Sequence, residues 1–97
     1  MATKEGVIGI SKAAAVDYAK QGIRVNTVIP GLIESGMSRE AIESGSDLVQ
    51  KLVAGHPIGR WGESSEIGEA VAWLLSDSAS FVTGVALPVD GGYCISK

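Results

Sequence analysis

The 97-residue sequence has few of the features that mark extracellular, membrane or nucleic-acid-binding proteins. Its single cysteine, Cys94, cannot form a disulfide within the chain, so a cytoplasmic location is expected. No apolar run approaches the roughly 18 residues that span a bilayer, and residues 1–6 lack the basic-then-apolar layout of a signal peptide. Eight basic and eleven acidic residues give a net charge of −3, so no basic surface for nucleic acid is expected.

What the sequence does contain is the composition of a globular chain. Hydrophobic residues make up 45% of it and charged residues 20%, which favours a packed core over disorder. The thirteen glycines are scattered, so no flexible linker is expected, and no internal repeat is visible. The length suits one small domain, and we assign residues 1–97 to a single, partial domain.

The first predicted element is a helix over residues 4–21. Apolar residues recur there at steps of three and four from Val7 to Tyr18, which predicts one apolar face with Tyr18 in the core. Thr3 is the expected N-cap, and Gly22 stands where a helix is expected to end.

Two strands are predicted. Residues 23–29 are rich in β-branched side chains and are followed by Pro30 and Gly31, and residues 85–89 form a second short strand. Pro88 cannot donate a hydrogen bond within a sheet, so this second strand is expected at a sheet edge.

The segment between the strands is predicted to be mostly helical. Residues 37–54 carry a weak, interrupted pattern that fits two short helices or a mobile segment. A turn-rich connection follows at residues 57–62. A clearer helix then runs to about Asp77, with Ser64 or Ser65 as its cap.

The predicted order of helix, strand, helices and strand has a topological consequence. Two strands joined by a helical crossover run parallel, almost always with a right-handed connection. Two strands are too few for a stable sheet, so we expect the first strand to have a further neighbour on its free edge.

Several segments carry motifs in a fixed order. They are KEGVIG at 4–9 with AVDYAKQGIRVN at 15–26, PGLIESGM at 30–37, PIGRWGE at 57–63, SDSASFVTG at 76–84 and VDGG at 89–92. Each motif is weak alone, but together they resemble the C-terminal portion of classical short-chain dehydrogenase/reductases (SDRs). The resemblance implies an α/β fold, the C-terminal part of a Rossmann-like doubly wound parallel sheet. It also implies hydride transfer between NAD or NADP and an alcohol or carbonyl substrate.

Lys4 is the catalytic residue that the resemblance assigns. The family places its catalytic tyrosine four positions before a lysine, and Ala2-Thr3-Lys4 is similar to the family's Ala-Ser-Lys. The tyrosine's place then falls one residue before Met1, and the glycine-rich loop, the cofactor selector and the catalytic serine fall further upstream. The resemblance implies that Lys4 holds the nicotinamide ribose and lowers the pKa of that tyrosine. The alternative is a solvated lysine, and we expect the chain alone to be inactive and to bind no cofactor.

The segment after the first strand is the second candidate site. Ligands of open parallel sheets bind beyond the carboxyl ends of the strands, and Pro30 with Gly31 marks such an end. The resemblance implies that the backbone of Ile33 contacts the nicotinamide carboxamide and that the hydroxyl of Ser35 contacts the carboxamide or phosphates. The family more often has threonine at the position of Ser35. The alternative is an ordinary strand-to-helix turn.

Other candidates are set aside or left open. Tyr93 and Lys97 repeat the tyrosine-to-lysine spacing, but they follow the last strand in a terminal tail, so we reject them as the catalytic pair. His56 has no neighbours at metal-ligand spacing, so no metal site is predicted, and it is assigned to the turn before Pro57. Residues 37–54 correspond to the family's substrate lid or to a plain pair of surface helices.

The aromatic residues suggest which surfaces pack together. Trp61, Trp73 and Phe81 are expected to pack the last helix against the sheet or against a partner chain. The resemblance implies a homo-oligomer, or assembly with the missing N-terminal part of the domain. An alternative of a different class is a truncated, noncatalytic module that self-associates through the free edge of its first strand.

Overall fold

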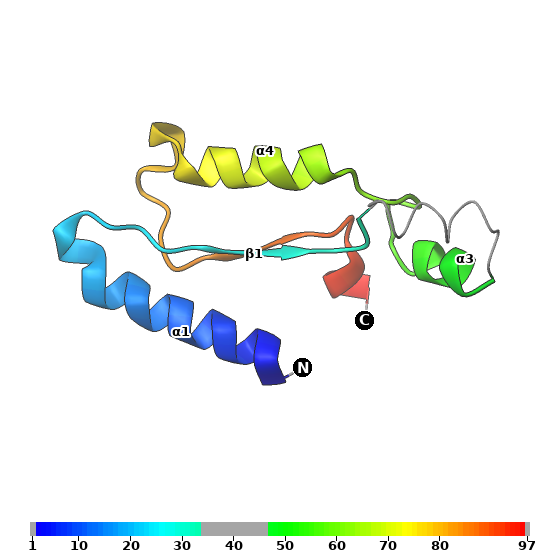
Figure 1. The fold of residues 1–97 in the computed structure, drawn as a ribbon, viewed down its shortest axis with the longest axis horizontal. Helices are drawn as coiled ribbons and strands as arrows, with labels where there is room; N and C mark the ends of the chain where they lie inside the picture. Colours follow the sequence, from blue (N-terminus) through cyan, green and yellow to red (C-terminus); the bar gives the residue numbers. More distant parts are fainter. Residues whose placement is uncertain (1, 34–46, 97) are drawn as a thin grey trace. The chain divides into compact units, whose positions relative to one another are not determined.

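The structure is a computed structural model, and it describes residues 2–33 and 47–96. Its elements are α1 (Ala2–Tyr18), the 3-10 helix η1 (Ala19–Gln21), β1 (Thr27–Pro30), α3 (Asp47–Ala54), α4 (Ser64–Leu75), η2 (Asp77–Ala79), β2 (Ala86–Val89) and η3 (Tyr93–Ser96) (Figure 1). The chain divides into two compact units. The first unit is residues 1–28 with 71–87, and the second unit is residues 29–70 with 88–97.

The two strands are neighbours in one parallel sheet. In the first unit the Thr27 N–H donates to the Val85 carbonyl at 2.8 Å, and in the second unit the Gly31 N–H donates to the Val89 carbonyl at 3.1 Å. From the first bond to the second, the donor moves from residue 27 to 31 and the acceptor from residue 85 to 89. Both numbers rise together, which is the pattern of a parallel pair. The predicted α/β class and the order of helix, strand, helices and strand are confirmed.

The helical segment at the start of the chain ends where the sequence predicts. Gly22 adopts the left-handed conformation, with φ of 78°, and its N–H donates to the Ala19 carbonyl at 3.1 Å. Glycine reaches this conformation without the steric cost that a side chain adds. The N-cap prediction for Thr3 is wrong, because α1 already includes Ala2. No helix among the described residues is long and apolar enough to cross a membrane.

β1 begins later than predicted, at Thr27 rather than at residue 23. The residues before it pair with the neighbouring segment partly through side chains, besides one backbone bond from the Gly84 N–H to the Val25 carbonyl at 2.8 Å. The Val25 N–H donates to the Thr83 hydroxyl at 3.1 Å. The Asn26 side chain donates to the Val82 carbonyl at 3.1 Å, and its carbonyl oxygen accepts from the Val85 N–H at 3.0 Å. β-Branched composition predicts extended backbone here but cannot show these substitute partners.

Arg24 closes the C-terminal end of α4. Its guanidinium donates to the carbonyls of Leu74 at 2.7 Å, Val82 at 3.1 Å and Ser76 at 3.3 Å, and the bonds are partly buried. The last carbonyls of a helix have no partner within the helix. The fixed fork of a guanidinium can serve several of them at once, which an ammonium group does less well.

Replacing Arg24 with methionine is therefore expected to lower the free energy of unfolding by about 1–3 kcal/mol, because partly buried carbonyls lose their donor. Arg24→Lys should recover less than half of that loss. Urea denaturation of the chain measures both values, with Lys20→Met in η1 as the control. Equal stability of Arg24→Met and the control would contradict this role.

Few side chains are buried within the described part of the chain. The buried apolar residues are Ala15, Leu74 and Ala79, whereas Tyr18 is 46% exposed and Trp73 is 47% exposed. The prediction that Tyr18 lies in the core is therefore wrong. Phe81 is fully exposed, so neither Trp73 nor Phe81 belongs to an internal core, whereas Trp61 is half-buried. Further large apolar side chains of α1 and α4 are exposed: Val7, Ile10, Val16, Val71 and Leu75.

Candidate cofactor loop

The candidate loop, Gly31 to Ile33, continues directly from β1 in the second unit. Besides the bond from Gly31 to Val89, the Leu32 carbonyl accepts from the Gly62 N–H at 2.9 Å. Ile33 and Gly62 form an isolated parallel bridge. The loop backbone is thus fixed on one side by Val89, the last residue of β2, and on the other by the connection that leads to α4.

Gly31 is required by a close approach of two backbones. A Cβ atom on Gly31 would lie 2.7 Å from the Cα and 2.8 Å from the Cβ of Asp90, closer than real Cβ contacts. The Cβ direction of Gly31 thus faces Asp90, and only a residue without a side chain permits this approach. Gly62 is less constrained: its Cβ would lie 2.7 Å from Cδ1 of Ile33, which is the end of a side chain that can move.

His56 holds the middle of the loop. The Leu32 N–H donates to its Nε2 at 3.1 Å, and its Nδ1 lies 2.8 Å from the Leu52 carbonyl. Because Nε2 accepts a hydrogen bond, the ring proton belongs on Nδ1, where it donates to Leu52. The residue is only 6% exposed, and its ring stacks on Tyr93 with centroids 4.6 Å apart. The sequence prediction placed His56 in the turn before Pro57, which is correct, but missed this role.

Asp90 turns its carboxylate onto the backbone that follows it. Its Oδ1 accepts from the Gly92 N–H at 3.1 Å, and its Oδ2 accepts from the Cys94 N–H at 3.0 Å. A hydrogen bond from the Cys94 side chain, followed by those two amides, holds the pKa of Asp90 below its usual value. Asp90 therefore caps the start of η3.

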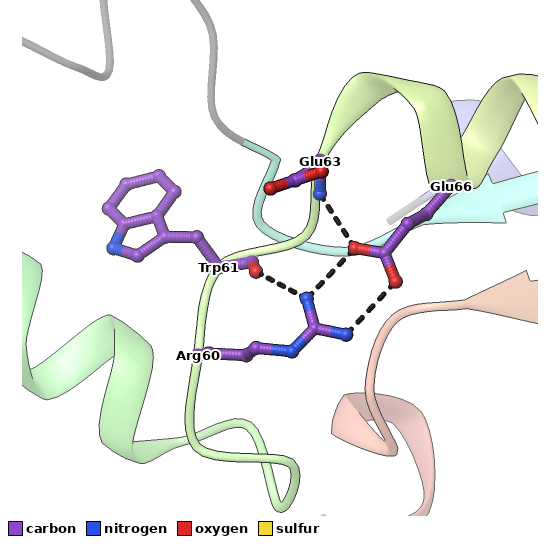
Figure 2. A network of polar contacts seen from close by, with 4 residues as sticks. All are labelled: Arg60, Trp61, Glu63 and Glu66. Carbon is purple, nitrogen blue, oxygen red and sulfur yellow. Dashed lines mark hydrogen bonds and ion pairs between the residues drawn. The ribbon is translucent and has the colours of Figure 1, made fainter.

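A polar network fixes the connection between the loop and α4 (Figure 2). Arg60 forms a two-pronged ion pair with Glu66, at 2.8 Å and 2.9 Å, and also donates to the Trp61 carbonyl at 3.0 Å. Glu66 accepts in turn from the Glu63 N–H at 2.9 Å. This is the reach of an N3 glutamate back to the N-cap residue, so Glu63 stands at the cap position. The prediction of Ser64 or Ser65 as the cap is wrong.

The ion pair between Arg60 and Glu66 makes the folding stability depend on pH, and the direction of this dependence follows from the pKa of Glu66. The hydrogen bond from Arg60, with that from the Glu63 amide, lowers the pKa of Glu66 to about 2 from its ordinary 4.5. A carboxylate whose pKa is lower in the folded state stabilises the fold at pH values above its ordinary pKa. This contribution is lost as the pH falls toward the pKa of the folded state. We expect wild type to exceed Glu66→Gln in stability at neutral pH, with the difference vanishing between pH 4.5 and 2.

Acid titration of unfolding, followed by circular dichroism, measures this difference. Glu69→Gln, on the same helix and exposed, is the matched control and should leave the pH profile of wild type unchanged. A gap between wild type and Glu66→Gln that persists undiminished to pH 2 would rule out the ion pair as its source.

The cavity beneath the loop is too small to be a ligand site. It has a volume of about 50 Å³ and is lined by both apolar and charged residues, among them Leu32, His56, Arg60, Glu66 and Asp90. Pockets for cofactors and substrates measure about 300–1,000 Å³.

A larger hollow of about 380 Å³ lies in the first unit. Its lining is apolar apart from Arg24 and Asn26, and both of these side chains already donate to backbone carbonyls. The hollow thus offers apolar surface without reactive groups. Among the described residues, no three histidine, cysteine, aspartate or glutamate side chains are grouped so that they could hold a metal ion.

The candidate site residues lie in different parts of the structure. Pro30, Gly31 and Ile33 lie together at the end of β1, as predicted from the strand boundary. Ser35 lies outside the described residues, as does most of the predicted lid except α3. Lys4 lies in the first turn of α1 and is exposed. It belongs to the first unit, whereas the loop belongs to the second.

Comparison with known proteins places this α/β chain in a class of oxidoreductases. A family model described as enoyl-(acyl carrier protein) reductase matches residues 1–94. The chain is 47% identical over 90 residues to 2,5-dichloro-2,5-cyclohexadiene-1,4-diol dehydrogenase of Sphingobium indicum, covering 93% of this chain and 36% of the relative. It is 48% identical over 93 residues to cyclohexanol dehydrogenase of an Acinetobacter species, covering 96% of this chain and 35% of the relative.

Solved protein structures are also similar to this chain. ElxO with NADP bound is 34% identical, with a TM-score of 0.88 over 97% of this chain and 38% of that one. A 4-hydroxyisoleucine dehydrogenase complexed with NADH is 31% identical, with a TM-score of 0.88 over 99% of this chain and 39% of that one. The chain belongs to the short-chain dehydrogenase/reductase family, and it spans little more than a third of the length of these relatives.

Proposed function

We propose that this chain forms the lysine and nicotinamide-loop portion of an NAD(P)-dependent oxidoreductase that transfers hydride between the cofactor and an alcohol or carbonyl substrate. The observation that carries the proposal is the loop after β1. It lies at the carboxyl end of a parallel strand, where open α/β sheets bind ligands. Bonds with Val89, His56 and Gly62 hold it rigidly.

The residues present fit a nicotinamide cofactor. A backbone segment fixed at each of its residues can hold a planar carboxamide without first losing conformational freedom. Ile33 is the residue proposed to contact the carboxamide through its backbone, and the Ser35 hydroxyl is proposed to assist. Lys4 is proposed to hold the ribose hydroxyls and to keep a tyrosine from the remainder of the protein acidic. The cofactor supplies the hydride chemistry, and the chain supplies binding and orientation.

The relatives suggest a substrate class. Both dehydrogenases named above, at 47% and 48% identity, carry the names of alcohols on six-membered carbon rings. We propose a secondary alcohol of this kind, or the matching ketone, as the substrate. Cyclohexanol and cyclohexanone are the probes to use first.

The exposed apolar surfaces support a need for a partner. Val7 and Ile10 on α1 are 51% and 73% exposed, although they lie on the face that the sequence predicts to be packed. Burying each such side chain contributes about 1.5–3 kcal/mol. We propose that the N-terminal part of the domain or a second copy of the chain covers them. Residues 1–97 would then form one partial domain that binds no cofactor by itself, and a cytoplasmic location is proposed from the single cysteine.

A chimera tests the proposal. In the Acinetobacter cyclohexanol dehydrogenase, the segment that this chain matches, 35% of the relative, is replaced by the present sequence. We expect the folded chimera to reduce NAD or NADP with a ring alcohol at a rate within about tenfold of the parent, since the grafted contacts position the cofactor. A folded chimera that binds no nicotinamide nucleotide and oxidises no alcohol would refute the proposed function.

A further inference from the structure

His56 joins two segments of the second unit that the chain separates. Its Nδ1 reaches the Leu52 carbonyl in α3, and its Nε2 reaches the Leu32 N–H in the loop after β1. The ring is nearly fully buried and stacks on Tyr93, with an angle of 28° between the ring planes. Both polar atoms of the ring are therefore used, and the ring has little freedom to turn.

The bond to Leu32 fixes the loop at its centre. Gly31 on one side bonds to Val89, and Leu32 bonds to Gly62 through its carbonyl. The remaining backbone donor of Leu32 points to the imidazole. Without that acceptor, a partly buried N–H would lack a partner, which is costly and is relieved by a change in backbone conformation. That change would fall directly before Ile33.

We infer that His56 is a positioning residue for the nicotinamide nucleotide. Through the acceptor Nε2 it holds the Leu32 amide, so that the adjoining backbone of Ile33 keeps the geometry that the nucleotide requires. The inference rests on the proposed function. The inference goes beyond the proposed function because it assigns a role to His56, which acts only through Leu32 and not by contact with cofactor or substrate.

Two substitutions separate this role from simple packing. The amide of glutamine reaches the place of Nε2, so His56→Gln retains an acceptor for the Leu32 N–H. The amide of asparagine reaches only the place of Nδ1, so His56→Asn retains the contact with Leu52 and loses that with Leu32. Both variants lose the ring and its stacking on Tyr93, and each keeps one of the two hydrogen bonds, so their comparison tells whether an effect follows the bond to the loop or the bond to α3.

The expected kinetic result, measured in the active chimera, is a nucleotide KM about tenfold higher in His56→Asn, with kcat within about threefold of wild type, because small displacements of a positioning group weaken binding strongly. His56→Gln should stay close to wild type in both. Loss of packing alone would reduce the active fraction in both variants and leave KM unchanged.

Hydrogen exchange of the folded chimera gives a readout that needs no activity. The Leu32 amide should exchange about fivefold to tenfold faster in His56→Asn than in wild type or His56→Gln, the size expected for one hydrogen bond. An active wild-type chimera with equal KM in both variants, or a Leu32 amide that exchanges alike in all three chains, would overturn this inference alone. An inactive wild-type chimera would overturn the proposed function and the inference with it.

Discussion

Replacing Lys4 with alanine is expected to lower kcat/KM of the chimera by about 10²- to 10⁴-fold, the range that general acid–base catalysis contributes. The reason is electrostatic. A cation beside a phenol stabilises the phenolate, so its removal raises the pKa of the tyrosine that the remainder of the enzyme supplies. Alcohol oxidation by Lys4→Ala should therefore require a higher pH than oxidation by wild type. Steady-state kinetics across pH measures both effects.

Lys20→Ala is the matched control for this prediction. Lys20 lies in η1, at the other end of the same helical segment, and is exposed as Lys4 is. We expect it to change kcat/KM by less than about twofold, as surface substitutions away from a site usually do. If Lys4→Ala behaved like Lys20→Ala, Lys4 would be the solvated lysine that the sequence left as the alternative.

The second large effect is expected at the end of β1. Gly31→Ala places a methyl group 2.7 Å from the Cα of Asp90, and backbone must move to admit it. Overpacking of this kind costs about 1–3 kcal/mol of folding free energy. The shift occurs two residues before Ile33, so nucleotide affinity should fall as well. Urea unfolding of the chain and nucleotide titration of the chimera measure the two losses.

Gly68→Ala is expected to have the opposite sign. Gly68 lies inside α4, and a Cβ there would meet nothing within 4 Å. Alanine in a helix interior is more favourable than glycine by about 0.8–1 kcal/mol. Gly68→Ala should therefore unfold at higher urea concentration than wild type, and Gly31→Ala at lower. If the two substitutions shifted the midpoint alike, the close approach of Gly31 to Asp90 would not be the cause.

The sequence predicts the elements well where local periodicity decides them. The helix predicted over 4–21 corresponds to α1 with η1, and the strand predicted over 85–89 corresponds to β2 at Ala86–Val89. The first strand is shorter than predicted, because Arg24 and Asn26 bond to backbone far along the chain. Contacts of that kind depend on the fold, and no local pattern contains them.

Burial is where the sequence fails. Tyr18 falls at the spacing of the apolar face of α1, yet it is 46% exposed. Phe81 is fully exposed. Periodicity shows which face of a helix is apolar but not whether a surface lies against it. The described residues cover Tyr18 only about half and leave Phe81 uncovered.

The candidate site was predictable in part. Pro30 and Gly31 mark the end of a strand in sequence, and the family motif adds Ile33 by position. His56 was missed because a solitary histidine carries no signal of a bond to Leu32. The ion pair of Glu66 with Arg60 and its cap on Glu63 appear only in the structure.

The most direct test of the central claim is a crystal structure of the chimera with NADH bound. We expect the nicotinamide carboxamide to bond to the backbone at Ile33, in the loop after β1. We also expect Nζ of Lys4 to lie within hydrogen-bond distance of the nicotinamide ribose. A nucleotide bound with its nicotinamide away from residues 31–33, or with Lys4 facing solvent, would contradict this claim.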